Sequence, residues 1–352
     1  MRIEAKKILF EGAVIPAIPL ALDKNRKFDE TAQRTLVRYY LHAGAGGIAV
    51  AVHSTQFEIR LPEVNLFFKT VKTVTDEINR FEKQTGKTVI KISGVCGPVE
   101  QAAAEARFAA DIGCDAALLS PGGLSDFDEG YMLGRTKEIA GIIPVIGFYL
   151  QPAAGGRIFS AEYWKKLANI EGVTAIKCAP FDRYKTLELV RGAALSERRS
   201  EIALYTGNDD NIITDLLTSY EINAEGKKIK MRFAGGLLGQ FAVWTKTAAD
   251  LFEKVKKHRE NGQIPAELLT LAAKLTDANA AIFDAANNYA GCIPGIHEVL
   301  RRQGLLEDIL CIDPKITLSP GQLEEIDRVY ADYPELNDDD FVKSNLSKWR
   351  NM

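Results

Sequence analysis

Lys177 stands at the end of a short apolar run, Val173–Thr174–Ala175–Ile176, and is followed by Cys178, Ala179 and Pro180. Such a run is typical of a buried parallel strand. A lysine at the end of that strand would have a packed stem and an amine that faces a cavity. Such an amine can lose its proton by desolvation and attack a carbonyl carbon to give a Schiff base. The alternative is a structural lysine that snorkels at a strand end.

Other polar residues follow other apolar runs. Schiff-base chemistry needs a neutral amine, a proton shuttle and donors for a substrate carboxylate, and Lys177, Tyr149 and the pair Ser54–Thr55 supply those groups. If the runs are parallel strands of one barrel, these residues meet at the carboxyl ends of the strands. The segments that follow the other strands there are Ser120–Gly123, Thr206–Asp209 and Gly235–Gly236.

The elements that must position these residues alternate along the chain. Strands are expected at residues 13–20, 47–52, 88–95, 116–119, 145–149, 173–177, 202–205 and 231–234. Helices are expected at 29–43, 62–81, 99–112, 128–140, from about 160, at 184–196, 209–220 and 240–258. Eight strand–helix units over about 250 residues predict a TIM (β/α)8 barrel; a doubly wound sheet is the rival.

Beyond residue 265 no strand pattern recurs, and residues 265–286, 295–303 and 320–333 are expected to be helical. The chain is therefore predicted to be a barrel over 1–260 with a C-terminal helical extension over 261–352. The polar segment 223–230 is interpreted as a surface loop, and the tail 335–352 is expected to pack loosely or on a partner.

Composition narrows the function classes. The net charge of −3 over 352 residues gives no reason to expect nucleic acid or an anionic membrane as a partner. No run of 18 apolar residues is present, and the N-terminal stretch lacks a convincing signal-peptide pattern. The five cysteines are scattered, which favours reduced thiols and the cytoplasm, and the four histidines are too dispersed to predict a metal site.

The segment Tyr149–Leu150–Gln151–Pro152, with Lys177 at the end of the next strand, resembles the dihydrodipicolinate synthase/N-acetylneuraminate lyase family of class I Schiff-base aldolases. Ala45–Gly46–Gly47–Ile48 followed by Ser54–Thr55 is similar to that family's glycine-rich hydroxyl loop. Further likeness lies in Thr206–Asp209, in Gly235–Gly236 and in Pro294–Gly295 with the residues 300–306. The likeness covers nearly the whole chain.

This resemblance implies a Schiff base between Lys177 and a 2-oxo acid such as pyruvate, with Tyr149 relaying protons. It implies that Ser54 and Thr55 hold the substrate carboxylate and that one of them joins the relay. The activity implied is that of a class I lyase, an aldolase or dehydratase, without a metal or organic cofactor and in a homo-oligomer, a dimer or tetramer. The other substrate-binding residues expected are His53, Gly207, Gly235 and Arg157.

Three positions depart from the family pattern. His53 stands where the family has glycine, no tyrosine lies near Gly122–Gly123, and Ala154 occupies the place of a substrate-binding arginine. The likeness therefore does not extend to dihydrodipicolinate synthase itself. His53 is either a replacement proton donor or a packing residue, and Arg157 either an anion ligand or a solvated loop charge.

Two other classes of function are considered. One is a catalytically silent barrel that binds a keto acid or sugar acid as a sensor or structural partner. The other is a metal-dependent barrel, which the lack of a His/Asp/Glu cluster at the strand ends disfavours.

Overall fold

The computed structural model describes residues 1–224 and 226–352. Its described part divides into two compact units. The first comprises Met1–Ala13 and Ile90–Leu237, and the second comprises Val14–Val89 and Leu238–Met352. The predicted boundary at residue 260 is not one of these divisions and stays a prediction.

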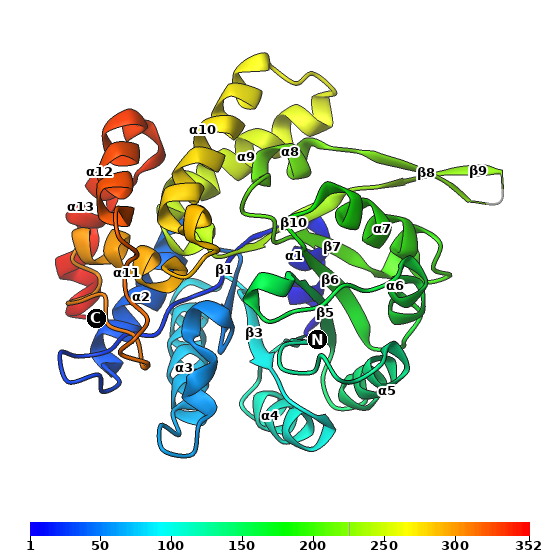
Figure 1. Ribbon diagram of the computed structural model, residues 1–352, viewed down its shortest axis with the longest axis horizontal. Helices are drawn as coiled ribbons and strands as arrows, with labels where there is room; N and C mark the ends of the chain where they lie inside the picture. Colours follow the sequence, from blue (N-terminus) through cyan, green and yellow to red (C-terminus); the bar gives the residue numbers. More distant parts are fainter. Residues whose placement is uncertain (225) are drawn as a thin grey trace. The chain divides into compact units, whose positions relative to one another are not determined.

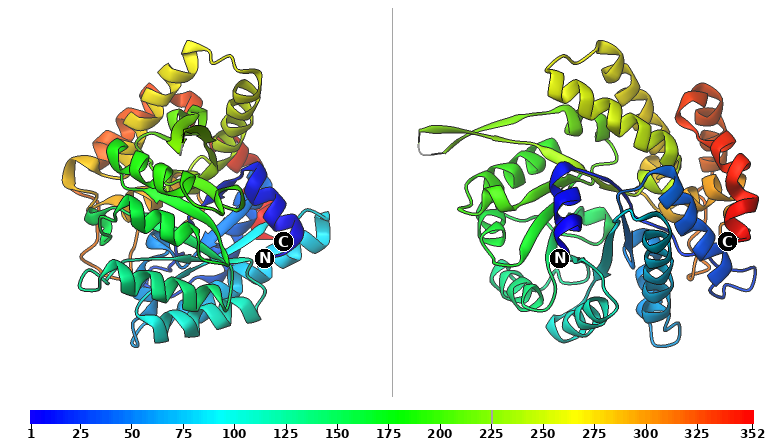
Figure 2. Two further views of the ribbon diagram at one scale, coloured as in Figure 1. Left: turned by 90° about the vertical axis from the view of Figure 1, so that its right-hand side faces the viewer. Right: turned by 180° about the vertical axis from the view of Figure 1, so that it is seen from behind.

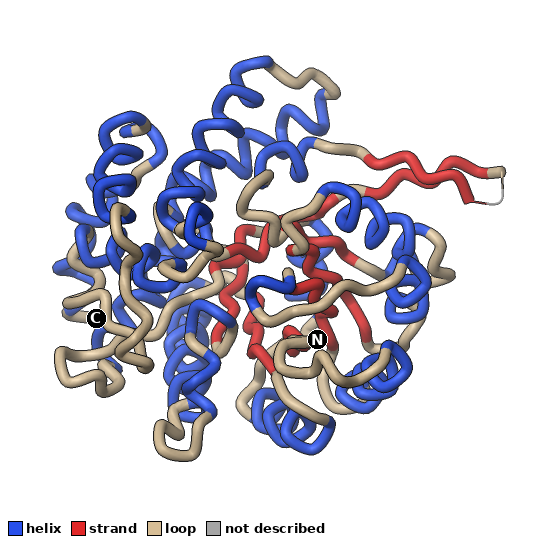
Figure 3. Tube along the Cα trace, in the orientation of Figure 1, coloured by secondary structure: helices blue, strands red, loops and turns tan. Residues whose placement is uncertain are grey.

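The first unit contains six consecutive parallel strands of a sheet (Figure 3). Their residues are almost entirely buried. Helices alternate with them along the chain. The caps Asp128, Ser160 and Asp182 each accept a backbone N–H of the helix that follows, which explains where three of these helices begin. The strands are β3 (Ile90–Val95), β4 (Ala116–Leu119), β5 (Val145–Leu150), β6 (Val173–Ala179), β7 (Ala203–Thr206) and β10 (Phe233–Leu238). The helices are α4 (Val99–Asp111), α5 (Glu129–Ala140), α6 (Ala161–Ala168), α7 (Arg183–Ala194) and α8 (Ile212–Leu217).

An N-terminal helix that the sequence patterns did not predict, α1 (Ile3–Glu11), also belongs to this unit. Arg2 pairs with Asp115, which directly precedes β4, at 2.7 Å, and Tyr205 of β7 donates its hydroxyl to the carbonyl of Leu9. The helix lies at the end where the strands begin (Figure 2). It therefore covers the end of this unit opposite to the strand termini that carry the polar residues.

The second unit holds two neighbouring strands, β1 (Val14–Pro16) and β2 (Gly47–Val50), joined in parallel through Ala17 and Ala49. Helix α2 (Glu30–Ala43) begins and ends as predicted, because Asp29 caps it and Gly44 takes the left-handed conformation with φ 107°. The other helices are α3 (Phe67–Thr85), α9 (Thr245–Asn261), α10 (Ala266–Ile282), α11 (Cys292–Arg302), α12 (Gln322–Asp332) and α13 (Asp339–Arg350).

The eight strands follow the order β1-β10-β7-β6-β5-β4-β3-β2, and β1 and β2 are themselves neighbours. This is the order of a (β/α)8 barrel, and four helices, α10 to α13, follow α9 at the C-terminal end of the chain. The predicted fold class, a TIM barrel with C-terminal helices, is confirmed.

Three predicted segments differ in the structure. Helix α3 begins at Phe67 rather than at residue 62, because residues 57–60 form a 3₁₀ turn and Asn65 has a positive φ of 46°. Residues 223–230 were expected to be a loop, but Tyr220–Ala224 (β8) and Lys227–Met231 (β9) form an antiparallel hairpin that contacts α7 and projects outward (Figure 1). Glu225 lies outside the described residues.

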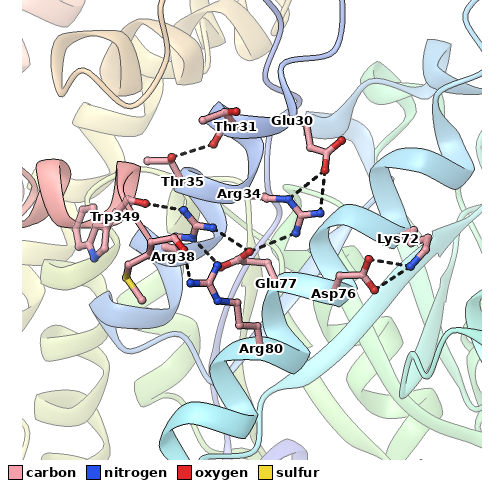
Figure 4. A network of polar contacts seen from close by, with 11 residues as sticks. Glu30, Thr31, Arg34, Thr35, Arg38, Lys72, Asp76, Glu77, Arg80 and Trp349 are labelled. Atoms are coloured by element: carbon pink, nitrogen blue, oxygen red, sulfur yellow. Dashed lines mark hydrogen bonds and ion pairs between the residues drawn. The ribbon is translucent and has the colours of Figure 1, made fainter.

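The C-terminal tail is packed, which corrects the expectation of a loose segment. Trp349 of α13 is fully buried against Tyr39, with ring centroids 5.7 Å apart. Arg38 donates to the backbone carbonyl of Trp349 at 2.7 Å and pairs with the buried carboxylate of Glu77 at 2.6 Å (Figure 4). The packing of the tail could not be predicted from the sequence, because one buried tryptophan and one backbone carbonyl leave no periodic hydrophobic pattern.

Candidate active site

Lys177 lies in β6 and faces the same side of the sheet as Phe148 of β5, its partner in the strand register. The lysine is 7% exposed, and its Nζ lies 4.4 Å from the centroid of the Phe148 ring. Among the described residues Lys177 forms no hydrogen bond and no ion pair. Burial lowers the pKa of Lys177 to about 8, and the charge of Asp209 opposes that shift.

Gly207 makes room for this lysine. A Cβ at Gly207 would lie 2.6 Å from Cε of Lys177 and 2.8 Å from Cβ of Ala179, so a larger residue would displace the lysine stem. The Gly207 N–H donates to the carbonyl of Cys178 at 2.7 Å, which holds the turn against β6. The structure therefore brings together two of the predicted site residues, Lys177 and Gly207, and the glycine lies against the lysine stem.

Three acidic residues with different surroundings follow β7: Asp209 and Asp210 in the turn, and Asp215 in α8. Asp215 accepts hydrogen bonds from Thr206 and Asn208 and pairs with Arg183 at 2.6 Å. Asp210 lies 3.7 Å from the same arginine. Asp209 is 9% exposed and is the carboxylate whose charge acts on Lys177. The sequence analysis had included Asp209 in a family-like segment but gave it no role.

Tyr149 does not face Lys177. It pairs in register with Cys178, one residue after the lysine, and successive side chains of a strand point to opposite faces. Its ring contacts Trp164 of α6 with centroids 5.0 Å apart. A Cβ at Gly147, two residues earlier, would lie 2.8 Å from the Leu167 side chain of α6, which confirms that this face of β5 meets the helix. This placement corrects the expected convergence of Lys177 and Tyr149.

The hydroxyl of Tyr149 is buried and has no hydrogen-bond partner among the described residues, although it lies near the backbone N–H of Phe159. Burial raises the pKa of Tyr149 to about 12. Tyr149→Phe is therefore expected to change kcat less than about threefold, rather than by the about 10²–10⁴ that follows loss of an acid–base group. Steady-state kinetics under conditions where chemistry limits turnover measure this. A loss of about 10² or more would place Tyr149 in the relay after all.

His53, Ser54 and Thr55 belong to the second unit, where they form a 3₁₀ turn after β2. The hydroxyl of Ser54 donates to the carbonyl of Ala17 at 2.7 Å, and that of Thr55 donates to the carbonyl of Ile18 at 2.7 Å. Each hydroxyl proton is thus engaged by the segment that follows β1. The His53 ring lies 6.0 Å from the ring of Phe57.

Gly235 and Arg157 lie in the first unit, and each contacts another segment of that unit. Gly235 lies inside β10, and a Cβ there would come within 2.3 Å of the Ala13 carbonyl and 2.9 Å of the Tyr205 ring. Its small size therefore lets the N-terminal segment pack closely, and Gly235 lies inside the strand rather than at its end. Arg157 donates to the carbonyl of Phe127, and its guanidinium lies 5.2 Å from the Phe159 ring. The arginine thus joins two loops.

Within residues 1–224 and 226–352, no group of three or more histidine, cysteine, aspartate or glutamate side chains is arranged to hold a metal ion. No helix in those residues is long and apolar enough to cross a membrane.

Solved structures with this fold cover nearly all of the chain. A dihydrodipicolinate synthase from Acinetobacter baumannii, in complex with pyruvate, is 19% identical, with a TM-score of 0.73 over 92% of this chain and 99% of that one. The chain has the fold of the dihydrodipicolinate synthases and N-acetylneuraminate lyases. An N-acetylneuraminate lyase from Fusobacterium nucleatum is 15% identical, with a TM-score of 0.69 over 92% and 99%. A prophage protein of the dihydrodipicolinic acid synthase family from E. coli K12, in complex with pyruvate, is 14% identical, with a TM-score of 0.71 over 92% and 97%.

No family model and no curated protein sequence matches the chain. The site features that the sequence analysis missed are Phe148 and Asp209. The alternation of side chains along a strand was the available signal for Phe148. A side chain on β5 faces the same side of the sheet as Lys177 only if its residue is the register partner of Lys177 or lies an even number of residues from that partner. Nothing in the sequence distinguished Asp209 from Asp210.

Proposed function

We propose that the protein is a class I lyase, an aldolase or dehydratase, that binds a 2-oxo acid such as pyruvate as a Schiff base of Lys177. The observation that carries this proposal is a nearly buried lysine close to the carboxyl end of β6, two residues before the strand ends at Ala179, with no ion pair among the described residues. The likeness to structures solved with pyruvate supports the choice of substrate class.

The lowered pKa of Lys177 is the second support. Only the neutral amine can attack a carbonyl carbon. With a pKa of about 8, about one amine in ten is neutral at pH 7, whereas an ordinary lysine has about one in three thousand. The site therefore raises the concentration of the nucleophile about 300-fold at neutral pH.

The remaining roles rest on the resemblance. We propose Ser54 and Thr55 as ligands of the substrate carboxylate, which requires that a hydroxyl exchange its present acceptor, Ala17 or Ile18, for the substrate. His53 remains proposed as a substrate-side residue. We also propose a cytoplasmic homo-oligomer, a dimer or tetramer, that needs no metal or organic cofactor.

Borohydride reduction in the presence of pyruvate tests the function. One covalent increment per chain is expected, mapped by peptide mass to Lys177. The initial rate of adduct formation should rise about tenfold per pH unit below pH 8 and level off above it, because neutral amine accumulates as pH approaches the pKa of Lys177. Asp209 is the neighbouring charge that bears on this pKa.

Lys91 provides the matched control, because it is another buried lysine of the first unit, 5% exposed, near the start of β3. Lys91→Arg should retain the adduct. An adduct on a different lysine would refute the assignment. If no 2-oxo acid is trapped while a keto acid or sugar acid still binds by calorimetry, the protein is a silent barrel, the alternative that the turned-away Tyr149 favours.

A further inference from the structure

Arg135 of α5 is a buried arginine without an ion pair. Its side chain is 1% exposed, and it forms one hydrogen bond, from Nε to the carbonyl of Gly97 at 2.8 Å. Its Nη2 is buried and has no hydrogen-bond partner among the described residues, and no carboxylate there pairs with the guanidinium. Arg38, the other buried arginine of the described residues, pairs with Glu77 at 2.6 Å. Arg135 lacks such a partner.

A buried guanidinium without an anion costs free energy. Burial lowers the pKa of Arg135, yet an arginine stays protonated in proteins, so loss of the proton does not remove this cost. The neighbouring groups do not neutralise the charge. Burial raises the pKa of Tyr163 well above its ordinary value, so the phenol stays neutral. The oxygens of Glu105 accept the N–H of Cys96 at 3.1 Å and the amide of Gln101 at 2.9 Å.

A small cavity adjoins the guanidinium. Helix α5 supplies Arg135 and Thr136 to its wall, α6 supplies Tyr163 and Leu167, and β5 supplies Gly147. Its volume of about 10 Å³ has room for one particle about the size of a water molecule. A monatomic ion meets that limit, whereas a carboxylic acid, a phosphate or a sulfate is too large.

We infer that Arg135 holds a small monovalent anion, a halide such as chloride, in this cavity. The anion accepts the Nη2–H that has no partner in the described chain, while Nε stays bound to Gly97. Because its phenol keeps its proton, Tyr163 is a second donor on the cavity wall. A water molecule fits the same space, but it brings no charge to offset that of the guanidinium. The site is independent of the proposed Schiff-base chemistry.

Thermal unfolding of the full-length chain at constant ionic strength tests the site, with sodium chloride or sodium bromide exchanged for sodium gluconate. Gluconate is too large for the cavity. A halide that binds only the folded state raises Tm by about 2–4 °C for each tenfold increase in its concentration once the site is filled.

Arg135→Met should lose this dependence on halide. In gluconate it should have a higher Tm than wild type, because methionine removes an uncompensated buried charge. Arg199→Met is the matched control, since it removes an exposed arginine of the same unit. It should keep the dependence.

A wild-type Tm that is the same in halide and in gluconate overturns the inference and identifies water as the occupant. A dependence that persists in Arg135→Met also overturns it, because the halide then acts elsewhere. If Arg135→Met does not fold, anomalous scattering from wild-type crystals soaked in bromide decides. A peak within hydrogen-bond distance of Arg135 Nη2 supports the site, and the lack of a peak there overturns it.

Discussion

Lys177→Met is expected to abolish the pyruvate adduct completely and to make the folded protein more stable. The folded-state pKa of Lys177 is about 8, below the ordinary value of 10.5, so burying the ammonium costs free energy wherever the lysine is charged in both states. That cost is fully present below pH 8, shrinks as pH rises towards 10.5 and is gone above it. Methionine removes it, for a gain of up to about 3 kcal/mol at pH 7.

Intact mass after borohydride treatment measures the first effect, and urea unfolding at pH 7 and at pH 10 measures the second. The gain over wild type should be smaller at pH 10. Lys177→Arg is the matched control: its guanidinium stays protonated, so it should form no adduct and gain no stability. A Lys177→Met protein less stable than wild type would mean that the amine contributes to the fold rather than to a reaction.

Trp349→Ala is expected to destabilise the second unit by about 3–5 kcal/mol, the usual cost of deleting a fully buried tryptophan side chain. The indole packs against the rings of Tyr39, His42 and Phe341, with centroids 5.5–6.0 Å away. Arg38 donates a hydrogen bond to the backbone carbonyl of Trp349, and alanine keeps that carbonyl. The loss in the free energy of unfolding therefore measures the packing of the indole. Urea unfolding followed by fluorescence and by circular dichroism gives the change.

Trp349→Phe provides the control for this prediction. Its ring retains part of the packing, and the indole N–H that it removes has no hydrogen-bond partner among the described residues. It should therefore cost clearly less than Trp349→Ala. If Trp349→Ala lowers the free energy of unfolding by less than about 1 kcal/mol, the tail contributes little to stability, as the expectation of a loosely packed C-terminus had it.

The barrel could be predicted because local patterns repeat. Runs such as Ala116–Leu119 are too short and too apolar for anything but a buried strand, and the structure gives β4 the same bounds. Asp29 and Gly44 delimit α2 through cap chemistry that acts within a few residues. The hairpin β8–β9 escaped prediction because its strands are polar and lysine-rich, and pairing rather than burial forms them.

The sequence by itself determined the alternation of strands and helices and the position of Lys177 within a strand, because these depend on hydrophobic period and turn chemistry. Only the tertiary structure decided which side chains face that lysine. Tyr149 and Phe148 are adjacent in the chain, but the register of β5 against β6 turns the first to α6 and the second to Lys177. A shift of one residue in that register would exchange them, and register is set by contacts between distant segments.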